Sequence, residues 1–327
     1  MVQLTRRFVL AGAGAALAGV RPGAAQTNYP ARPITLTLPW AAGGGTDATA
    51  RIVGALLERE LGQPVNVVNR TGGSGVVGHA ALASAAPDGY TIGMVTVEIA
   101  MMHHQGLTEL TPASYTPLGL LINNPPGVMV NATSPYEDVR ALADFIKASP
   151  PGKLKASGTG QGGIWHVALA GWLQAIGVKP DHVIWVPSQG AAPAMQDLAA
   201  GGIDLATCSI PEGRTMIEAG KARALAVMAP QRNPIFPDVP TLKEGMGIDY
   251  TAGGWAGLAA PKGLPPAIER RLVAAIKKSF ESADYAEFIR SRGFVSQWAG
   301  GADFARFMSE QDSFMGATMK AAGLAKS

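Results

Sequence analysis

Cysteine is almost absent from this 327-residue sequence, and the single residue, Cys208, has no partner for an internal disulfide. Cysteine and histidine nowhere recur with the spacing of a zinc site, so we expect no metal centre. Cys208 lies in the apolar segment LATCS, which is the setting of a small buried hydrophobic residue rather than of a reactive thiol.

Charge of one sign and long apolar runs are also scarce. The net charge is +3, and Lys and Arg occur singly or in pairs, so we expect no nucleic-acid partner. Beyond the N-terminus, no apolar run approaches the roughly 18 residues of a membrane-spanning helix. Hydrophobic residues make up 47% of the chain, which excludes a disordered protein, and the length suffices for two domains.

The N-terminal segment has the layout of an export signal. Arg6 and Arg7 precede a short apolar stretch, residues 8–20, and a small-residue site follows that ends at Ala25. We expect residues 1–25 to be removed there and the mature protein to act in the periplasm. The paired arginines leave two export routes open, twin-arginine and Sec.

Apolar periodicity alternates between strand and helix along the chain. Residues 33–39 read as a strand, and residues 47–62 place apolar positions on one helical face. The same order of strand, glycine turn and helix recurs in residues 65–96 and 153–200, which implies doubly wound parallel sheets. We predict an α/β protein of two lobes, each a mostly parallel sheet flanked by helices, with residues 26–124 and 250–327 in lobe 1 and 125–249 in lobe 2.

Two glycine patterns match the dinucleotide fingerprint G-x-G-x-x-G. Each follows an expected strand and opens an expected helix. However, Asp181, the acidic residue after the second pattern, precedes the next strand instead of ending it, and chance matches are common among 41 glycines. An exported dinucleotide-dependent oxidoreductase therefore remains the alternative function, whereas the favoured one needs no cofactor. The matching glycines are Gly73, Gly75 and Gly78, and Gly158, Gly160 and Gly163.

Nucleophilic catalysis lacks its usual elements, and we do not expect an enzyme. No G-x-S-x-G elbow is present. His103 and His104 would suit a metal pair, but adjacent side chains on an extended chain point to opposite faces, so we expect an exposed loop. His79 and His166 each follow a glycine turn near a helix start, where a loop-bracing role is expected.

The glycine turns suit a small anion. A helix N-terminus presents unpaired N–H groups and a partial positive charge, and glycine lets a ligand approach the backbone. The turns at 41–46 in lobe 1 and at 157–163 and 188–192 in lobe 2 would meet at the C-terminal ends of the strands. Asp47, in a first helical turn, either caps its helix or faces the cleft and receives an ammonium or hydroxyl group of the ligand.

Blocks spread over nearly the whole mature chain resemble one family, the solute receptors of tripartite tricarboxylate transporters, also called Bug-type periplasmic binding proteins. The resemblance implies a two-lobed flytrap that closes on a small carboxylate and delivers it to the membrane components of such a transporter. We expect a monomer. In chain order the blocks are YPARPITLTLPWAAGGGTDATAR, ERELGQPVNVVNRTGGSGVVG, AAPDGYTIG, VPSQGAAPAMQDLAAGGID, AGKARALAV, FPDVPTLKEGMG and GLAAPKGLP.

The resemblance also implies which residues bind the ligand, largely through backbone amides, hydroxyls and waters. This chain departs from the family pattern at Trp40, Trp165 and residues 188–189. The two tryptophans either clamp a bulky or aromatic carboxylate or pack beneath their loops. Glu212, after another strand, would discriminate charge at the far end of the ligand. The expected ligand-binding residues are Trp40, Ala42, Gly43, Gly44, Thr46, Asp47, Thr159, Gly160, Trp165, His166, Ser188, Gly190, Ala191, Ser209 and Glu212.

Overall fold

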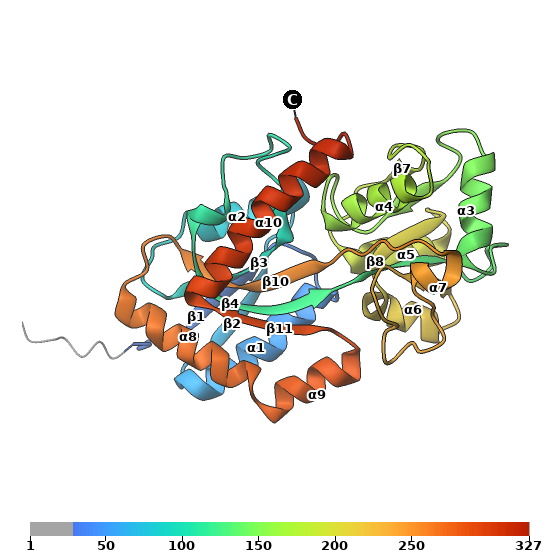
Figure 1. Ribbon diagram of the computed structural model, residues 1–327. Helices are drawn as coiled ribbons and strands as arrows, with labels where there is room; N and C mark the ends of the chain where they lie inside the picture. The colour runs from blue at the N-terminus through green and yellow to red at the C-terminus, as the bar shows by residue number, and fades with distance from the viewer. Residues whose placement is uncertain (1–28, 327) are drawn as a thin grey trace, which may run out of the picture.

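The computed structural model describes residues 29–326, which form two α/β lobes, each built on one sheet (Figure 1). This confirms the two-lobed fold expected from the sequence. The chain crosses between the lobes where β4 (Tyr115–Asn124) leads into β5 (Pro126–Asn131), and it returns between β9 (Ala222–Val227) and β10 (Gly254–Pro261). We propose that the lobes divide after residues 124 and 249. The expected export signal lies outside the described residues.

The sheet of lobe 1 has six strands within the described part of the chain, in the order β11-β4-β10-β3-β1-β2. β1 (Ile34–Leu38) pairs in parallel with β2 (Val65–Asn69) and with β3 (Thr91–Thr96). β10 runs antiparallel to β3 and β4, and β11 (Ser296–Gly300) runs antiparallel to β4. The sheet is therefore mixed, not mostly parallel as predicted. The chain leaves lobe 1 along β4 and re-enters it along β10, and these two neighbouring strands run in opposite directions.

The sheet of lobe 2 has five strands over the same described range, in the order β7-β6-β8-β5-β9. β6 (Lys155–Ser157) pairs in parallel with β7 (Ile184–Trp185) and β8 (Leu205–Ser209). β5 runs antiparallel to β8 and β9, so this sheet is mixed for the same reason.

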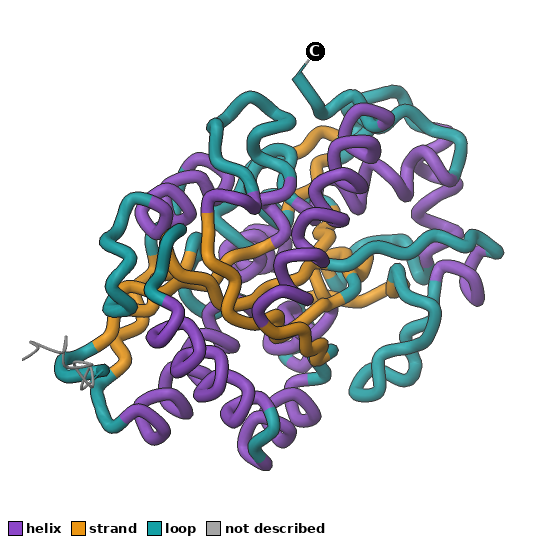
Figure 2. Tube along the Cα trace, turned by 60° about the vertical axis from the view of Figure 1, so that its left-hand side comes forward, coloured by secondary structure: helices purple, strands orange, loops and turns teal. Residues whose placement is uncertain are grey.

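Helices lie on either side of the strands (Figure 2). In lobe 1, α1 packs against α8, and α10 packs against β4. No helix in residues 29–326 is both long and apolar enough to span a membrane. The helices of lobe 1 are α1 (Gly45–Leu61), α2 (Val76–Ala83), α8 (Pro266–Phe280), α9 (Ala283–Arg292) and α10 (Gly301–Ala321); those of lobe 2 are α3 (Val139–Ala148), α4 (Ile164–Ala175), α5 (Ala191–Ala200), α6 (Arg214–Glu218) and α7 (Leu242–Met246).

Apolar side chains from the strands form the cores. Ile34 and Leu36 on β1 are fully buried, as the alternating pattern of that segment predicts, and so is Trp172 on α4. Cys208 is buried in β8, as its apolar segment predicts, and burial raises the pKa of its thiol well above the usual value.

Three helices begin directly after glycine turns. The residues that precede them are Gly44 before α1, Gly163 before α4 and Gly190 before α5, and none of these helices has a side-chain cap of its own. Gly190 has a φ of 132°, which favours glycine. The first N–H groups of these helices thus need partners from elsewhere in the molecule or from a ligand.

Candidate ligand-binding site

The glycine turns of the two lobes meet around a cavity of about 40 Å³. The Ala41 amide of lobe 1 donates to the Gln189 carbonyl of lobe 2 at 2.9 Å, which holds two of the turns together. The volume is far below the roughly 150 Å³ of a cavity that binds benzene, so an aromatic ligand would need the lobes to open further. Of the expected residues, Trp40, Gly44, Thr46, Thr159, Trp165, Gly190, Ala191 and Glu212 line the cavity.

The other expected residues lie outside this lining. Ala42 and Gly43 are exposed on the outside of the first turn. Gly160 packs against Ser74 of lobe 1, so it contributes to contact between the lobes. The Ser188 hydroxyl donates to the carbonyl within its own turn at 3.0 Å. The residues that do not line the cavity are Ala42, Gly43, Asp47, Gly160, His166, Ser188 and Ser209.

Asp47 is buried within lobe 1 and bound to partners there. Its carboxylate accepts from the Arg51 guanidinium at 2.8 and 3.0 Å and from the Asn69 amide at 3.0 Å. It also reaches back to the Gly43 N–H at 3.0 Å. Burial alone would raise the pKa of Asp47, but these hydrogen bonds outweigh it and keep the pKa below the usual value. These contacts occupy the carboxylate within lobe 1, so Asp47 braces the turn before α1 instead of contacting a ligand or capping a first N–H of the helix.

Glu212 extends from lobe 2 to the start of α1 in lobe 1. It lies in the short turn η4 (Ile210–Gly213) after β8, and its Oε1 accepts from the Gly45 N–H at 2.8 Å. Its Oε2 accepts from the N–H and the hydroxyl of Ser209 at 3.1 and 2.9 Å. Ser209 therefore acts on the cavity by orienting Glu212.

Glu98, which sequence reasoning missed, makes the reciprocal contact. It lies in η2 (Val97–Ala100) after β3 of lobe 1 and is 2% exposed. Its Oε1 accepts from the N–H of Ile164, the first residue of α4 in lobe 2, at 3.1 Å, and its Oε2 accepts from the Thr96 hydroxyl. Each lobe thus supplies a carboxylate to the first amide of a helix in the other lobe. The signal in the sequence was an acidic residue two positions after a buried strand.

Both glutamates line the cavity, and among the described residues no Lys, Arg or His lines it with them. The backbone N–H groups of Ile164, Gly45 and Ser209 donate to these oxygens, and such hydrogen bonds favour the ionised form. Burial raises the pKa of Glu98, with a further contribution from Glu212, and burial also raises the pKa of Glu212. The positive ends of α1 and α4 are what offset the cost of burying these charges.

His79 fixes the wall next to Glu98. Its Nε2 accepts from the Thr96 N–H at 3.2 Å, so the other ring nitrogen carries the proton and donates to the Gly75 carbonyl at 2.9 Å. Burial lowers the pKa of His79 to about 4, which keeps the ring neutral. The Trp40 indole donates to the Thr96 hydroxyl at 3.4 Å, which orients Trp40 at the cavity.

His166 braces the turn before α4 in a similar way. Its Nδ1 accepts from the Gly162 N–H at 3.0 Å, and its ring stacks on Trp185. Burial lowers the pKa of His166 to about 4. Both histidines thus have the bracing role expected from the sequence, and His166 does not line the cavity.

Three indoles line the cavity, two expected and one missed. Trp165 packs against Gly254 of lobe 1, where a Cβ would lie 2.6 Å from the ring. The missed residue is Trp255 on β10, which is 1% exposed and whose N–H has no hydrogen-bond partner within residues 29–326. A buried donor of this kind calls for a water or a ligand atom.

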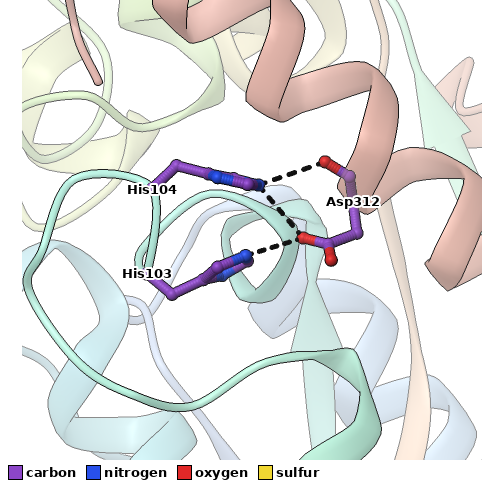
Figure 3. A group of neighbouring side chains, drawn as sticks. All are labelled: His103, His104 and Asp312. Atoms are coloured by element: carbon purple, nitrogen blue, oxygen red, sulfur yellow. Dashed lines mark hydrogen bonds and ion pairs between the residues drawn. The ribbon is translucent and has the colours of Figure 1, made fainter. Parts of the chain in front are cut away.

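His103 and His104 do not point to opposite faces, which corrects the sequence-based expectation. Their rings lie 4.0 Å apart, and both Nε2 atoms face Asp312 on α10 (Figure 3). The segment is coiled and not extended, since the Met102 N–H bonds to the Glu98 carbonyl and the Gly106 N–H to the His103 carbonyl. Successive side chains on such a coil turn by about 100° instead of 180°.

Comparison with known proteins identifies relatives that cover most of the chain. Residues 49–324 match the tripartite tricarboxylate transporter family receptor. A protein from Pseudomonas sp. strain P51, named for the tcbD-tcbE intergenic region, is 33% identical over 92% of this chain and 89% of its own length. Among solved structures, MatC from Rhodopseudomonas palustris with bound malate is 28% identical, with a TM-score of 0.81 over 89% of this chain and 99% of that one. The periplasmic binding protein BugD is 28% identical, with a TM-score of 0.83 over 91% of this chain and 100% of that one.

We predict that His79 and His166 stay neutral in the folded protein down to about pH 5. Their pKa values of about 4 lie below the ordinary 6.5, so between these values the unfolded chain binds protons that the folded protein does not. Their contribution to the unfolding free energy is fully present above pH 6.5 and is lost as the pH falls towards 4, by about 3 kcal/mol for each ring.

The raised pKa values of Glu98 and Glu212 act in the opposite direction, because stability from them is lost as the pH rises through their folded values. The pH dependence of stability therefore combines both effects, whereas ring-proton NMR titration measures the pKa of each histidine separately. Midpoints near 6.5 for both rings would contradict the burial that we describe.

Proposed function

The chain belongs to the tripartite tricarboxylate transporter receptor family, and on that basis we propose that it captures a small organic carboxylate between its lobes. The family consists of periplasmic solute receptors. The captured ligand then passes to the membrane components of a tripartite tricarboxylate-type transporter. We also propose that the protein works as a monomer after export, with cleavage after Ala25 and with the twin-arginine and Sec routes both open.

The observation that best supports a carboxylate is the arrangement of helix N-termini around the cavity. Thr46, in the first turn of α1, and Ala191, at the start of α5, come from different lobes and both line the cavity. N–H groups in a first helical turn have no acceptor within the helix, and together with the helix dipole they bind anions. The malate bound to MatC supports the same ligand class.

We assign no catalytic role to this site. The alternative of a dinucleotide-dependent enzyme requires glycines that leave room for a pyrophosphate, whereas these glycines are closed by packing. A Cβ on Gly78 would lie 2.6 Å from the Pro39 Cα, and Gly158 lies against the Thr207 carbonyl. Gly160 lies against Ser74. The fingerprint glycines thus serve contacts inside and between the lobes.

The variant Gly44→Leu tests the proposed site. Gly44 lines the cavity and has an ordinary φ of −81°, so a leucine can be tolerated by the backbone but extends beside Glu212. In a thermal-shift screen of mono-, di- and amino-carboxylates, the wild type should gain about 2.7 kcal/mol at a hundredfold excess of ligand over its Kd. Gly44→Leu should fold and lose this gain.

Ala42→Leu is the matched control, because Ala42 belongs to the same turn but is exposed outside the cavity. It should keep the ligand-induced shift. A Gly44→Leu protein that still binds the ligand would exclude this turn as the site, and a wild type that responds to no carboxylate would contradict the proposed function.

A further inference from the structure

We propose that the ligand carries a protonated amine as well as its carboxylate, and that Glu98 and Glu212 bind the amine. This inference rests on the proposed receptor function and specifies its ligand. It starts from the reciprocal contacts between the lobes, in which the first amides of α1 and α4 are already occupied by carboxylates of the protein itself.

A ligand with two carboxylates would meet like charges in this cavity. Its second carboxylate would either displace a glutamate from Gly45 or Ile164, or lie beside two anions that no basic side chain among the cavity-lining residues neutralises. A protonated amine meets the opposite situation, because it is attracted by both carboxylates.

The glutamates also have acceptor capacity to spare. A carboxylate offers about four lone-pair positions, and Glu98 uses one for the Ile164 N–H and one for the Thr96 hydroxyl. Glu212 uses one for Gly45 and two for Ser209. An ammonium group brings three N–H donors and no acceptor, which matches the lone-pair positions that remain free on the two carboxylates.

The indoles add to this preference. Trp40, Trp165 and Trp255 line the same cavity as the two glutamates. The face of an indole attracts a cation, and a cavity with several aromatic walls is a common way to bind ammonium groups. Neither indoles nor glutamates favour a second negative charge.

The two ends of such a ligand would have different partners. The carboxylate suits the amides of Thr46 and Ala191, whose helices belong to opposite lobes, and the amine suits Glu98 and Glu212. The sequence made Asp47 a candidate to receive an ammonium group of the ligand. We assign this role to Glu98 and Glu212 instead.

Three sets of matched compounds test this inference by calorimetric titration. Each set holds an amino-carboxylate, the carboxylate without the amine and the dicarboxylate of similar length: β-alanine, propionate and malonate; 4-aminobutyrate, butyrate and succinate; 5-aminovalerate, valerate and glutarate. The best-fitting amino-carboxylate should bind at least about tenfold more tightly than both of its counterparts.

The variants Glu98→Gln and Glu212→Gln keep the shape of the side chain and remove its charge. Each should reduce the ratio of the amino-carboxylate affinity to the plain-carboxylate affinity by about tenfold, because weaker closure of the lobes affects both compounds of a set alike and cancels in the ratio. Glu137→Gln, an exposed glutamate outside the cavity, is the control and should behave as wild type. The two variants are independent, so one that fails to fold leaves the other to report.

The outcomes separate this inference from the proposed function. Dicarboxylates that bind more tightly than their amino counterparts, or variants that leave the preference unchanged, overturn the inference and leave a carboxylate receptor. A failure of all carboxylates to bind overturns both.

A second inference comes from a separate place in lobe 1. We propose that His103, His104 and Asp312 form a binding site for a transition-metal dication, with Zn²⁺ as the best match. One donor atom from each residue lies within 4.8 Å of the others (Figure 3). Within residues 29–326, these three side chains form a cluster with the composition of a metal site. Two imidazoles and one carboxylate are a ligand set that Zn²⁺ accepts, with a further position left for water.

The distances between the donor atoms fit a shared ion. Asp312 Oδ1 lies 2.9 Å from His103 Nε2 and 3.2 Å from His104 Nε2, close to the separation of about 3.3 Å between ligands that are each about 2.0 Å from a tetrahedral Zn²⁺. Within residues 29–326, Asp312 Oδ1 has no hydrogen-bond partner in acceptable geometry, so the nitrogens face it without a well-aligned N–H bond. His104 Nε2 also lies 3.2 Å from the Asp312 carbonyl oxygen.

A glycine in α10 provides the space for one of the rings. Gly316 follows Asp312 by one helical turn, and a Cβ there would lie 2.7 Å from the His104 ring. Glycine inside a helix costs about 1 kcal/mol relative to alanine, so its presence here has a structural reason in the close approach of the imidazole.

Titration with ZnCl₂ tests this site on protein made without a histidine tag and stripped with EDTA. One Zn²⁺ should bind per chain, with MgCl₂ showing no comparable binding, and His104→Gln or Asp312→Asn should weaken Zn²⁺ binding by at least about tenfold. Asp303→Asn, on the same helix and paired with Arg306, should bind Zn²⁺ as wild type does. Absence of Zn²⁺ binding, or binding that these variants do not change, overturns the proposal.

Discussion

A carboxylate from each lobe rests on the first amide of a helix in the other lobe, and the closed form of the molecule depends on this exchange. A buried carboxylate without a basic partner is costly, and the positive end of a helix is the compensation that these glutamates find. Since the helix belongs to the opposite lobe, the compensation exists only when the lobes meet. Closure and the charge of the cavity are therefore set by the same four groups: Glu98, Glu212, Gly45 and Ile164.

This exchange also decides what the cavity attracts. Two like charges 4 Å apart repel by about 4 kcal/mol at an effective dielectric of 20, which is enough to separate ligand classes by orders of magnitude. The remaining helix amides still suit one carboxylate, as the family of receptors requires. In this receptor, Glu98 and Glu212 thus form an acidic side of the ligand cavity. The hydrogen bonds between His79 and Thr96 and between Thr96 and Glu98 hold Glu98 in place.

Much of this was predictable from the sequence because it follows from local rules. Strand and helix periodicity gave the α/β lobes, and the glycine turns correctly indicated where helices start around a cleft. Glu212 was identified from its place after a strand, and Trp40 from the resemblance to the receptor family. The mixed sheets were missed because they arise from pairing between strands far apart in the sequence. β10 returns to lobe 1 antiparallel to β4, and no local pattern records this direction.

Other features required the three-dimensional arrangement. Glu98 gains its partner from a helix 66 residues away in the other lobe, which no local pattern records. Asp47 had two open interpretations, and its bracing role depends on Asn69 and Arg51 lying beside it. His103 and His104 were misjudged because a coiled turn, not an extended strand, carries them, and their shared partner comes from α10.

The most direct test of the account is a crystal structure of the protein with the amino-carboxylate that binds best, read at the first amides of α1 and α4. The account predicts that Glu212 and Glu98 remain on Gly45 and Ile164, with the ligand amine in contact with both glutamates. A ligand carboxylate found on either amide, with its glutamate displaced, would contradict it.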